Sequence, residues 1–259
     1  MPTVSDRLTV ARSIIGEAAH RAMAHFIARD SLPLEQKSAS DFVSEADRDV
    51  ETLIRARLQH CLPGDRMLGE EMGGDVSDSF WAIDPIDGTA NFLRGSPLWG
   101  VSLGYVEAGR PVVGVVAYPA LSLTLSAADG LGIQKNGAAF HRHVSFPEIR
   151  LASVGESAQW PAEEMAQTEL ALRRDGWGIT EYRCATIGLG FAALGFTDGY
   201  VERHTSIWDI AAGAVLCSEA GLVVQQSGTT ETAAMTILAA TPPLAILLRP
   251  LVELPQVAD

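Results

Sequence analysis

The sequence predicts a mixed fold, in which an N-terminal α+β part is followed by an α/β part. Apolar residues recur at helical spacing as far as residue 58. A β-rich stretch with alternating apolar residues runs from residue 99 to residue 140. After His143, strand-like and helix-like segments alternate, which is typical of an α/β unit. We therefore expect two domains, residues 1–145 and residues 146–259.

The N-terminal part is expected to open with two amphipathic helices. Ser5 caps the first helix, in which apolar residues repeat as far as Phe26. Ser44 and Asp47 begin the second helix, and Pro63-Gly64 ends it. The strands expected next are residues 66–68 and 81–83, a hairpin over 99–119 that turns at 107–110, and two more antiparallel segments over 121–127 and 131–140.

The C-terminal part is expected to alternate between strands and helices. The predicted order is strand 151–154, helix 163–174, strand 179–182, helix 189–195, strand 199–202, helix 209–219 and strand 222–224. Two uncharged stretches, 111–128 and 232–248, approach membrane-spanning length, but both contain internal proline and several small polar residues. We interpret each as a buried strand pair or as a strand and a helix, and expect no membrane segment.

The composition excludes several classes of protein. A chain of 259 residues with 47% hydrophobic residues can bury a sizeable core. Its net charge is −13, its isoelectric point is near 4.8, and no run of Lys or Arg is present, so direct nucleic-acid binding is not expected. The three cysteines are far apart and show no C-x-x-C spacing, which indicates neither a disulfide framework nor a zinc site. Charged residues interrupt the N-terminal segment, so we expect no export signal and a cytoplasmic location.

The hexapeptide Asp84-Pro85-Ile86-Asp87-Gly88-Thr89 is the most informative motif. It follows the apolar run 81–83, and Pro85 is expected to end that strand. Gly88 permits backbone conformations that a side chain would forbid, so Asp84 and Asp87 can point into one pocket. If the amides of Gly88 and Thr89 begin a helix, they can hold an anion beside these carboxylates. Carboxylates next to an anion indicate a bridging metal; the alternative is an Asp-capped turn.

Two further acidic strings extend this pattern. Glu70 and Glu71 follow the short strand 66–68, so one of them stands at a strand end, as Asp84 does; alone, the pair could be a solvated loop. Asp209, in Ile207-Trp208-Asp209, lies in the first turn of the predicted helix 209–219. A carboxylate suits the helix dipole there and is by itself more often a helix-stabilising acid than a metal ligand.

Together these strings resemble the inositol monophosphatase family of magnesium-dependent sugar-phosphate phosphatases, over nearly the whole chain. The family's strand-end G-E-E, its D-P-[IL]-D-G-T-x-N-F and its W-D-x-A-A-G with E-A-G match Glu70, residues 84–92 and residues 208–221. Its lesser marks include Lys37-Ser38 ahead of Asp41. The resemblance implies a layered α-β-α-β-α sandwich of the inositol monophosphatase/fructose-bisphosphatase type. It also implies two or three Mg²⁺ per site, sensitivity to lithium, and a homodimer.

The resemblance also assigns roles to individual residues. Glu70 and Thr89 would orient and deprotonate the attacking water, with Asp47 supporting Thr89; capping of its own helix is an equally favoured role for Asp47. The metal ligands implied are Glu70, Asp84, the Ile86 carbonyl, Asp87 and Asp209. The substrate contacts implied are Asp87, Gly88, Thr89, Ala185, Glu202 and Asp209. Bound cations would let so acidic a protein accept a phosphate dianion.

Inositol monophosphate is the leading substrate, and the alternatives are histidinol phosphate or another sugar phosphate. Arg183 stands where the family commonly has glycine, which leaves two possibilities: it binds a second anionic group of the substrate, or it forms a structural salt bridge. Glu202 is either the family's hydroxyl-binding acid or a surface acid at a strand end. A non-enzymatic role, as a regulatory partner of the transcription or RNA-processing machinery, is a further alternative, and the intact ligand set favours activity.

Overall fold

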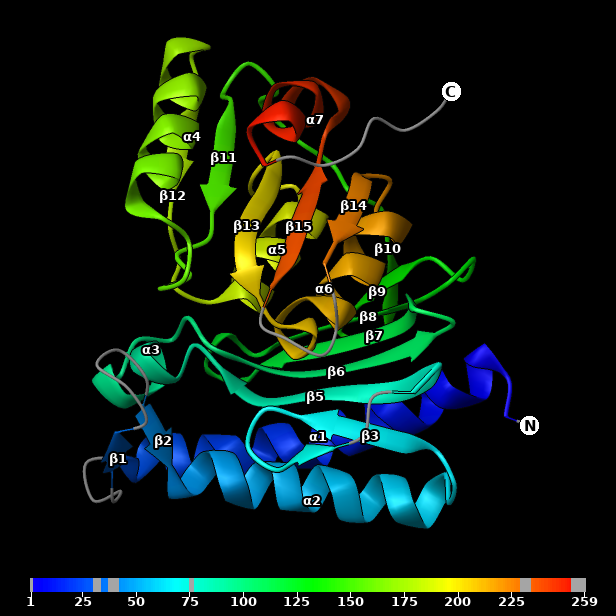
Figure 1. Cartoon of the computed structure of the whole chain (residues 1–259). Coiled ribbons are helices and arrows are strands. Elements are labelled where there is room, and N and C mark those ends of the chain that lie inside the picture. Colours follow the sequence, from blue (N-terminus) through cyan, green and yellow to red (C-terminus); the bar gives the residue numbers. More distant parts are fainter. Residues whose placement is uncertain (1, 30–33, 37–41, 75–76, 229–233, 253–259) are drawn as a thin grey trace.

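The structure is a computed structural model, and it describes residues 2–29, 34–36, 42–74, 77–228 and 234–252. Helices and sheets stack in five layers, with two sheets separated and flanked by helices (Figure 1). This confirms the layered α-β-α-β-α order expected from the resemblance. The Lys37-Ser38 and Asp41 marks lie outside the described residues. No helix in the described part of the chain is both long and apolar enough to cross a membrane.

The helices and strands have the following bounds. The α-helices are α1 (Val4–Ile27), α2 (Glu45–Cys61), α3 (Thr89–Arg94), α4 (Ala162–Arg174), α5 (Ala185–Leu194), α6 (Ile207–Glu219) and α7 (Pro242–Leu248), with 3-10 turns η2 (Pro119–Leu121) and η3 (Arg249–Leu251). The strands are β1 (Leu34–Gln36), β2 (Phe42–Ser44), β3 (Arg66–Gly69), β4 (Gly73–Gly74), β5 (Ser79–Asp87), β6 (Gly100–Glu107), β7 (Arg110–Tyr118), β8 (Leu123–Ala128), β9 (Ile133–Lys135), β10 (Ala138–Phe140), β11 (Leu151–Val154), β12 (Gly178–Thr180), β13 (Gly199–Thr205), β14 (Val223–Ser227) and β15 (Met235–Ala240).

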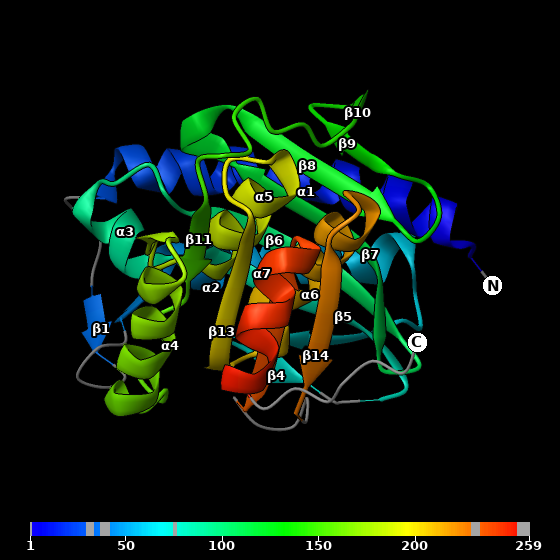
Figure 2. The same cartoon turned by 90° about the horizontal axis from the view of Figure 1, so that it is seen from above.

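The described strands form two large sheets and a small β1-β2 pair. The first sheet has the order β10-β9-β8-β7-β6-β5-β3-β4, and the second has the order β12-β11-β13-β15-β14. Helices α1 and α2 cover one face of the first sheet, and α5 and α6 lie between the two sheets (Figures 1 and 2). Helices α4 and α7 cover the outer face of the second sheet (Figure 2). Three clusters of buried apolar residues fill the spaces between these layers.

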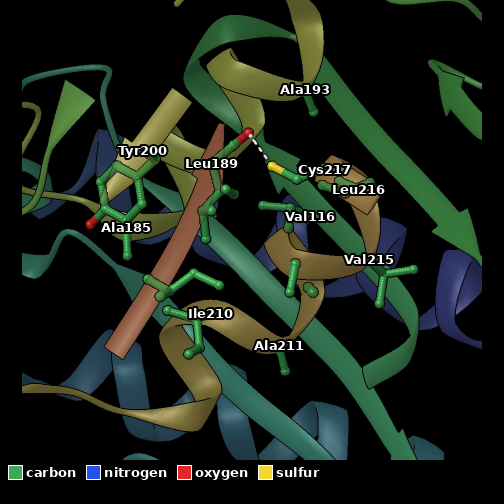
Figure 3. Close-up of a cluster of buried hydrophobic side chains, with 14 of the residues drawn as sticks. Val116, Ala185, Leu189, Ala193, Tyr200, Ile210, Ala211, Val215, Leu216 and Cys217 are labelled. Atoms are coloured by element: carbon green, nitrogen blue, oxygen red, sulfur yellow. Dashed lines mark hydrogen bonds between the residues drawn. The ribbon is translucent and has the colours of Figure 1, made fainter. Parts of the chain in front are cut away.

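The middle helix layer lies unusually close to the first sheet. Gly104 of β6 and Gly114 of β7 are cross-strand partners beneath α6. A Cβ on Gly114 would lie 2.3 Å from the carbonyl oxygen of Ala212, and one on Gly104 would lie 2.8 Å from the Cβ of Ala211. The small residues after Trp208 are therefore needed where α6 touches the sheet. Figure 3 shows the contact between α6 and its neighbour α5, where the Cys217 thiol donates a hydrogen bond to the Leu189 carbonyl at 3.2 Å.

Most of the predicted elements are present, and several expectations about their ends were wrong. Helix α1 begins two residues earlier than expected, because Thr3 and Asp6 form a reciprocal capping box and Ser5 lies inside the helix. Helix α5 begins at Ala185, four residues before the expected start at residue 189. Strand β5 continues through Pro85 to Asp87. The hairpin and the pair in residues 111–128 are confirmed as β6, β7 and β8.

The stretch 232–248 contains a strand and a helix, β15 and α7, which is one of the two interpretations of that segment. Strand β15 pairs antiparallel with both of its neighbours, β13 and β14. The second sheet is therefore mixed, although β11 pairs in parallel with β12 and β13. The chain passes from one sheet to the other between β10 and β11. The two-domain division near residue 145 stays a prediction, and the central core cluster draws residues from both sides of it.

Candidate active site

A bulge at the end of β5 brings Asp84 and Asp87 to the same face of the first sheet. Asp84 pairs with Ser102 and Asp87 pairs with Gly100, with an irregularity between the two pairs. The three-residue step on β5 therefore opposes a two-residue step on β6. In a regular strand, residues three apart point to opposite faces, but one extra residue restores them to the same face. Proline is tolerated at such a bulge, which explains why Pro85 does not end the strand.

Helix α3 starts directly after this bulge. Gly88 has a φ of 85°, and it precedes the first helical residue, Thr89. Gly88 thus has the left-handed conformation that glycine adopts freely, as expected from the motif. The hydroxyl of Thr89 donates a hydrogen bond to the carbonyl oxygen of Ile86 at 3.0 Å. The helix expected after Gly88 is therefore confirmed, whereas the expected turn at Pro85 is replaced by the bulge within β5.

Asp84 is the buried centre of an acidic cluster. Only 1% of the residue is exposed, and neither carboxylate oxygen accepts a hydrogen bond from any donor in the described part of the chain. Burial raises its pKa well above the usual value, and the charges of Glu70, Asp87, Asp209 and Asp47 raise it further. These are the acids that the sequence singled out, drawn from β5, α2, α6 and the end of β3. The structure therefore brings the five predicted acids together.

The structure distinguishes Glu70 from Glu71. The backbone N–H of Glu70 donates to the Ile83 carbonyl at 3.2 Å, and its side-chain charge acts on Asp84. The side chain of Glu71 instead lies 3.9 Å from the Arg48 guanidinium, and its backbone N–H donates to Glu51 at 2.9 Å. Of the two glutamates at the strand end, Glu70 faces the acidic cluster and Glu71 belongs to the contacts with α2.

Asp209 enters the cluster from the first turn of α6. Its Oδ2 atom accepts the backbone N–H of Ser206 and the hydroxyl of Thr205, both at 2.8 Å. The helix-stabilising role weighed for Asp209 is therefore real, because it forms a capping box with Ser206. Burial and the charge of Asp87 raise its pKa to about 7. When one proton is present, Asp84 and Asp209 can share it as a hydrogen bond, which two ionised carboxylates cannot do.

Asp87 connects the motif to α5. Its Oδ2 atom accepts the backbone N–H of Thr186 at 2.6 Å and the thiol of Cys184 at 3.2 Å. Ala185 also donates through its backbone, so the carboxylate sits on the first turn of α5. Burial still raises the pKa of Asp87, although these donors oppose the rise. Burial likewise raises the pKa of the Cys184 thiol well above its usual value, so this thiol stays protonated and serves as a donor.

Glu202 is buried beside this cluster, and it is no surface acid. Only 7% of it is exposed, and the charges of Asp209 and Asp87 act on it. Burial raises its pKa to about 8. The hydroxyl of Tyr200 donates to its Oε2 atom at 2.6 Å.

The donors present fit a hard divalent cation. Within the described residues, no three Asp, Glu, His or Cys side chains already stand in an arrangement that would hold a metal ion. In the described part of the chain, the two buried oxygens of Asp84 have no donor, and the charges that act on Asp84 are those of carboxylates. Such an all-oxygen set suits Mg²⁺ and does not suit metals that prefer His or Cys.

Comparison with known proteins agrees with the family resemblance that the motifs indicate. Residues 4–249 match the sequence pattern described as the Inositol monophosphatase family. The chain belongs to this family. The inositol-1-monophosphatase SuhB of Mycobacterium tuberculosis is 34% identical over an alignment 263 residues long, which covers 92% of this chain and 90% of the relative. The histidinol-phosphatase of the same organism is 35% identical over 224 residues, covering 83% of this chain and 85% of the relative.

A solved structure agrees as well. The extragenic suppressor protein suhB from Bartonella henselae superposes with a TM-score of 0.84 and 25% identity, covering 94% of this chain and 97% of that protein. The layered fold expected for an inositol monophosphatase is thus confirmed by comparison and by the element order. The expected enzyme class, phosphoric monoester hydrolase, is confirmed at the level of the family.

The position of Arg183 shows why the inositol monophosphatase family commonly has glycine there. Arg183 has a φ of 52°, in the left-handed region that favours glycine. Its guanidinium pairs with the Glu156 carboxylate at 2.8 Å, and half of the side chain is exposed. It lines a cavity of about 790 Å³ together with residues of α4, and Asp84 and Asp87 are not among the lining residues. The salt-bridge interpretation of Arg183 is therefore confirmed.

Sequence reasoning missed the residues that hold the acids in place. Thr186 is an ordinary polar residue in the sequence, and its contact with Asp87 appears only when α5 packs beside the bulge. Thr205 lies four residues before Asp209 and contacts it locally at the start of α6. Tyr200 carried a usable signal, because it lies two residues before Glu202 on a strand and therefore shares its face. Nothing in the sequence indicated that Gly155 packs against Glu202.

Proposed function

We propose that this protein hydrolyses a small phosphate monoester, most favourably inositol monophosphate, with Mg²⁺ as its cofactor. The observation that carries the proposal is the state of Asp84, whose two buried oxygens have no hydrogen-bond donor in the described residues while four other acids surround it. A protein keeps such a group at a cost of about 1–3 kcal/mol unless a ligand satisfies it. The family membership supplies the reaction class.

The residues proposed to hold the metal ions are Glu70, Asp84, the Ile86 carbonyl, Asp87 and Asp209. Bound Mg²⁺ supplies positive charge that draws the phosphate dianion in and lowers the pKa of a nearby water. The charges of the other acids all act on Asp84, which supports its role as a residue that would hold the metal ions. Two or three ions per site, lithium inhibition and a homodimer remain expectations from the family resemblance.

The protein's own groups are assigned to the proton transfer and to orientation of the substrate. Glu70 is proposed to take the proton of the attacking water, and Thr89 to orient that water, with Asp47 behind it. The half-buried position of Glu70 beside Asp84 supports its role, because the group is both sheltered and within reach of solvent. The amides of Gly88 and Thr89 are assigned to the phosphate, and Ala185, whose amide donates to Asp87, is assigned only as a further substrate contact.

Glu202 is proposed to contact a hydroxyl group of the substrate alcohol. Its burial beside Asp209 and Asp87 supports this role. Histidinol phosphate is the second candidate substrate, because a relative named histidinol-phosphatase is as similar to this chain as the one named inositol-1-monophosphatase. The salt bridge of Arg183 with Glu156 gives no support to a substrate with a second phosphate.

A panel of phosphate esters tests the proposal. Phosphate release is measured with Mg²⁺ on inositol 1-phosphate, histidinol phosphate, fructose 1,6-bisphosphate and adenosine monophosphate. We expect the highest kcat/KM on inositol 1-phosphate. A higher value on histidinol phosphate would transfer the assignment to that substrate, and no release from any ester would favour the regulatory alternative.

A further inference from the structure

Tyr200 and Glu202 form a buried pair on one face of β13. The Tyr200 hydroxyl donates to Oε2 of Glu202 at 2.6 Å, and the two residues are 2% and 7% exposed. A hydrogen bond buried away from water is electrostatically stronger than one in solvent. The bond therefore restricts Glu202 to the orientations in which one oxygen meets Tyr200.

Gly155 closes the space on another side of Glu202. It follows β11, and its backbone N–H donates to the Val201 carbonyl at 2.8 Å. A Cβ at this position would lie 2.4 Å from Cδ of Glu202 and 2.5 Å from its Cγ. The φ of Gly155 is not positive, so its backbone conformation does not demand glycine. The space taken by Glu202 is what excludes a side chain at residue 155.

The tyrosine ring is itself fixed by α5. A Cβ on Gly188 would lie 2.3 Å from the Cδ2 atom of the Tyr200 ring, so the ring lies directly on the helix backbone. Helix α5 is also the helix that Asp87 caps through Thr186. Tyr200 therefore links Glu202 to α5, which is also the helix that Asp87, a proposed metal ligand, contacts.

We propose that Tyr200 and Gly155 are positioning residues that hold Glu202 in one orientation and thereby set the selectivity of the site for a hydroxyl group of the substrate alcohol. The inference rests on the proposed function, since it concerns the same site. Because Tyr200 already donates to one oxygen, Glu202 offers less acceptor capacity and less charge to a ligand than a bare carboxylate does. A neutral hydroxyl needs only one acceptor, whereas an ammonium group gains most from full negative charge. The substrate class favoured is therefore a polyol monophosphate over an amino-alcohol monophosphate.

Kinetics of two variants test this proposal. Tyr200→Phe removes the donor, and Gly155→Ala displaces Glu202 by contact. The substrates are inositol 1-phosphate, histidinol phosphate and p-nitrophenyl phosphate, which has no hydroxyl group for Glu202 to bind. We expect Tyr200→Phe to raise KM for inositol 1-phosphate about 10-fold with kcat within about twofold, because Glu202 no longer keeps the orientation that meets the substrate hydroxyl and about one hydrogen bond to the substrate is lost. Its kcat/KM ratio of inositol 1-phosphate to histidinol phosphate should fall, and p-nitrophenyl phosphate should change by less than about twofold.

The matched controls are Tyr105→Phe and Gly16→Ala. Tyr105 is also nearly buried, but it packs against Trp81 in the cluster beneath the first sheet. Gly16 lies on α1 with no atom within 4 Å of an added Cβ. Both controls should leave all three substrates unchanged. An equal loss on p-nitrophenyl phosphate, or an unchanged KM for inositol 1-phosphate in both test variants, would overturn the proposal.

Crystal structures of Tyr200→Phe and Gly155→Ala keep the two proposals separable. If the wild-type protein with Mg²⁺ hydrolyses none of the three esters, the proposed function fails, and the positioning claim is then decided by the structures alone. A Glu202 side chain that turns or becomes disordered in both variants supports the claim. An unchanged Glu202 in both variants overturns it. Thermal unfolding of each variant shows that the protein compared is folded.

Discussion

The carboxylate of Asp87 accepts the backbone N–H of Thr186 at 2.6 Å, across 99 residues of sequence. Helix α5 has no side-chain cap from its own N-cap residue, Cys184, so a residue at the end of β5 provides that contact. One carboxylate thus supports the helix and belongs to the acidic cluster. Because Asp87 has two oxygens, both roles are compatible.

Substitutions of Asp87 should separate these two roles. Asp87→Asn keeps an oxygen that can accept the Thr186 N–H but removes the charge, so we expect kcat/KM to fall at least about 100-fold with little change in unfolding free energy. Asp87→Ala should lose a similar amount of activity and also about 1–2 kcal/mol of stability, as for a lost helix cap. Chemical denaturation and steady-state kinetics measure the two effects. Equal stability of both variants would show that the contact with Thr186 does not support α5.

Asp84→Asn should raise stability and abolish activity. In excess chelator, Asp84 is a buried group with no donor among the described residues and with four acids around it. An asparagine amide can donate to those carboxylates, so the metal-free variant should be more stable by about 1 kcal/mol or more, a rise in Tm of about 2–4 °C. Activity with Mg²⁺ should fall at least about 100-fold. Asp129→Asn, in an exposed pair with Arg110, is the control and should change neither quantity appreciably. A lower Tm for Asp84→Asn in chelator would contradict the interpretation of the cluster.

Substitution of Glu70 should lower activity much more than substitution of its neighbour Glu71. Glu70→Gln removes a charge that acts on Asp84, and kcat/KM should fall at least about 30-fold. Glu71→Gln weakens a 3.9 Å pair with Arg48 and leaves the backbone contact of residue 71 with Glu51 in place, so its activity should stay within about threefold. Both variants are assayed on the same substrate with saturating Mg²⁺. Comparable losses would mean that Glu70 has no special role.

The identity of the acids could be predicted from the sequence because short motifs place them at the ends of strands and helices. Asp87 ends a strand and Asp209 lies in the first turn of a helix, where local backbone preferences are strong, and Asp84 is fixed three residues before Asp87 by the same motif. The course of β5 through Pro85 was not predictable, since a bulge depends on the pairing with β6. The left-handed φ of Arg183 was likewise hidden, because the residue type gives no sign of it.

Tertiary contacts explain the remaining gap. Burial of Glu202 follows from the way β13 packs on α5, and strand spacing shows which residues share a face but not which face is covered.

The start of α1, in contrast, depends on a local signal. Thr3 is the N-cap in place of Ser5 because Asp6 lies three residues after Thr3 and completes a capping box, so this start could have been predicted from the sequence alone.

Affinity for Mg²⁺ should increase with pH up to about pH 7. Burial and the charge of Asp87 raise the pKa of Asp209 from 3.8 to about 7, so the metal-free folded protein holds a proton that the unfolded chain has already lost. Its stability therefore falls as pH rises from about 4 to about 7. Mg²⁺ must displace that proton, so Kd should fall by up to about tenfold per pH unit below pH 7 and then level off. Calorimetry in two buffers of different ionisation enthalpy measures the protons released. A Kd independent of pH between 6 and 8 would contradict the assignment of Asp209 as a ligand.

The most direct test of the account is phosphate release from inositol 1-phosphate by protein stripped of metal, before and after Mg²⁺ is restored. If Asp84 and its neighbours work only around bound cations, hydrolysis in excess chelator should be at least about 1,000-fold slower, and added Mg²⁺ should restore it in wild-type protein but not in Asp84→Asn. Undiminished hydrolysis in excess chelator would contradict the central claim.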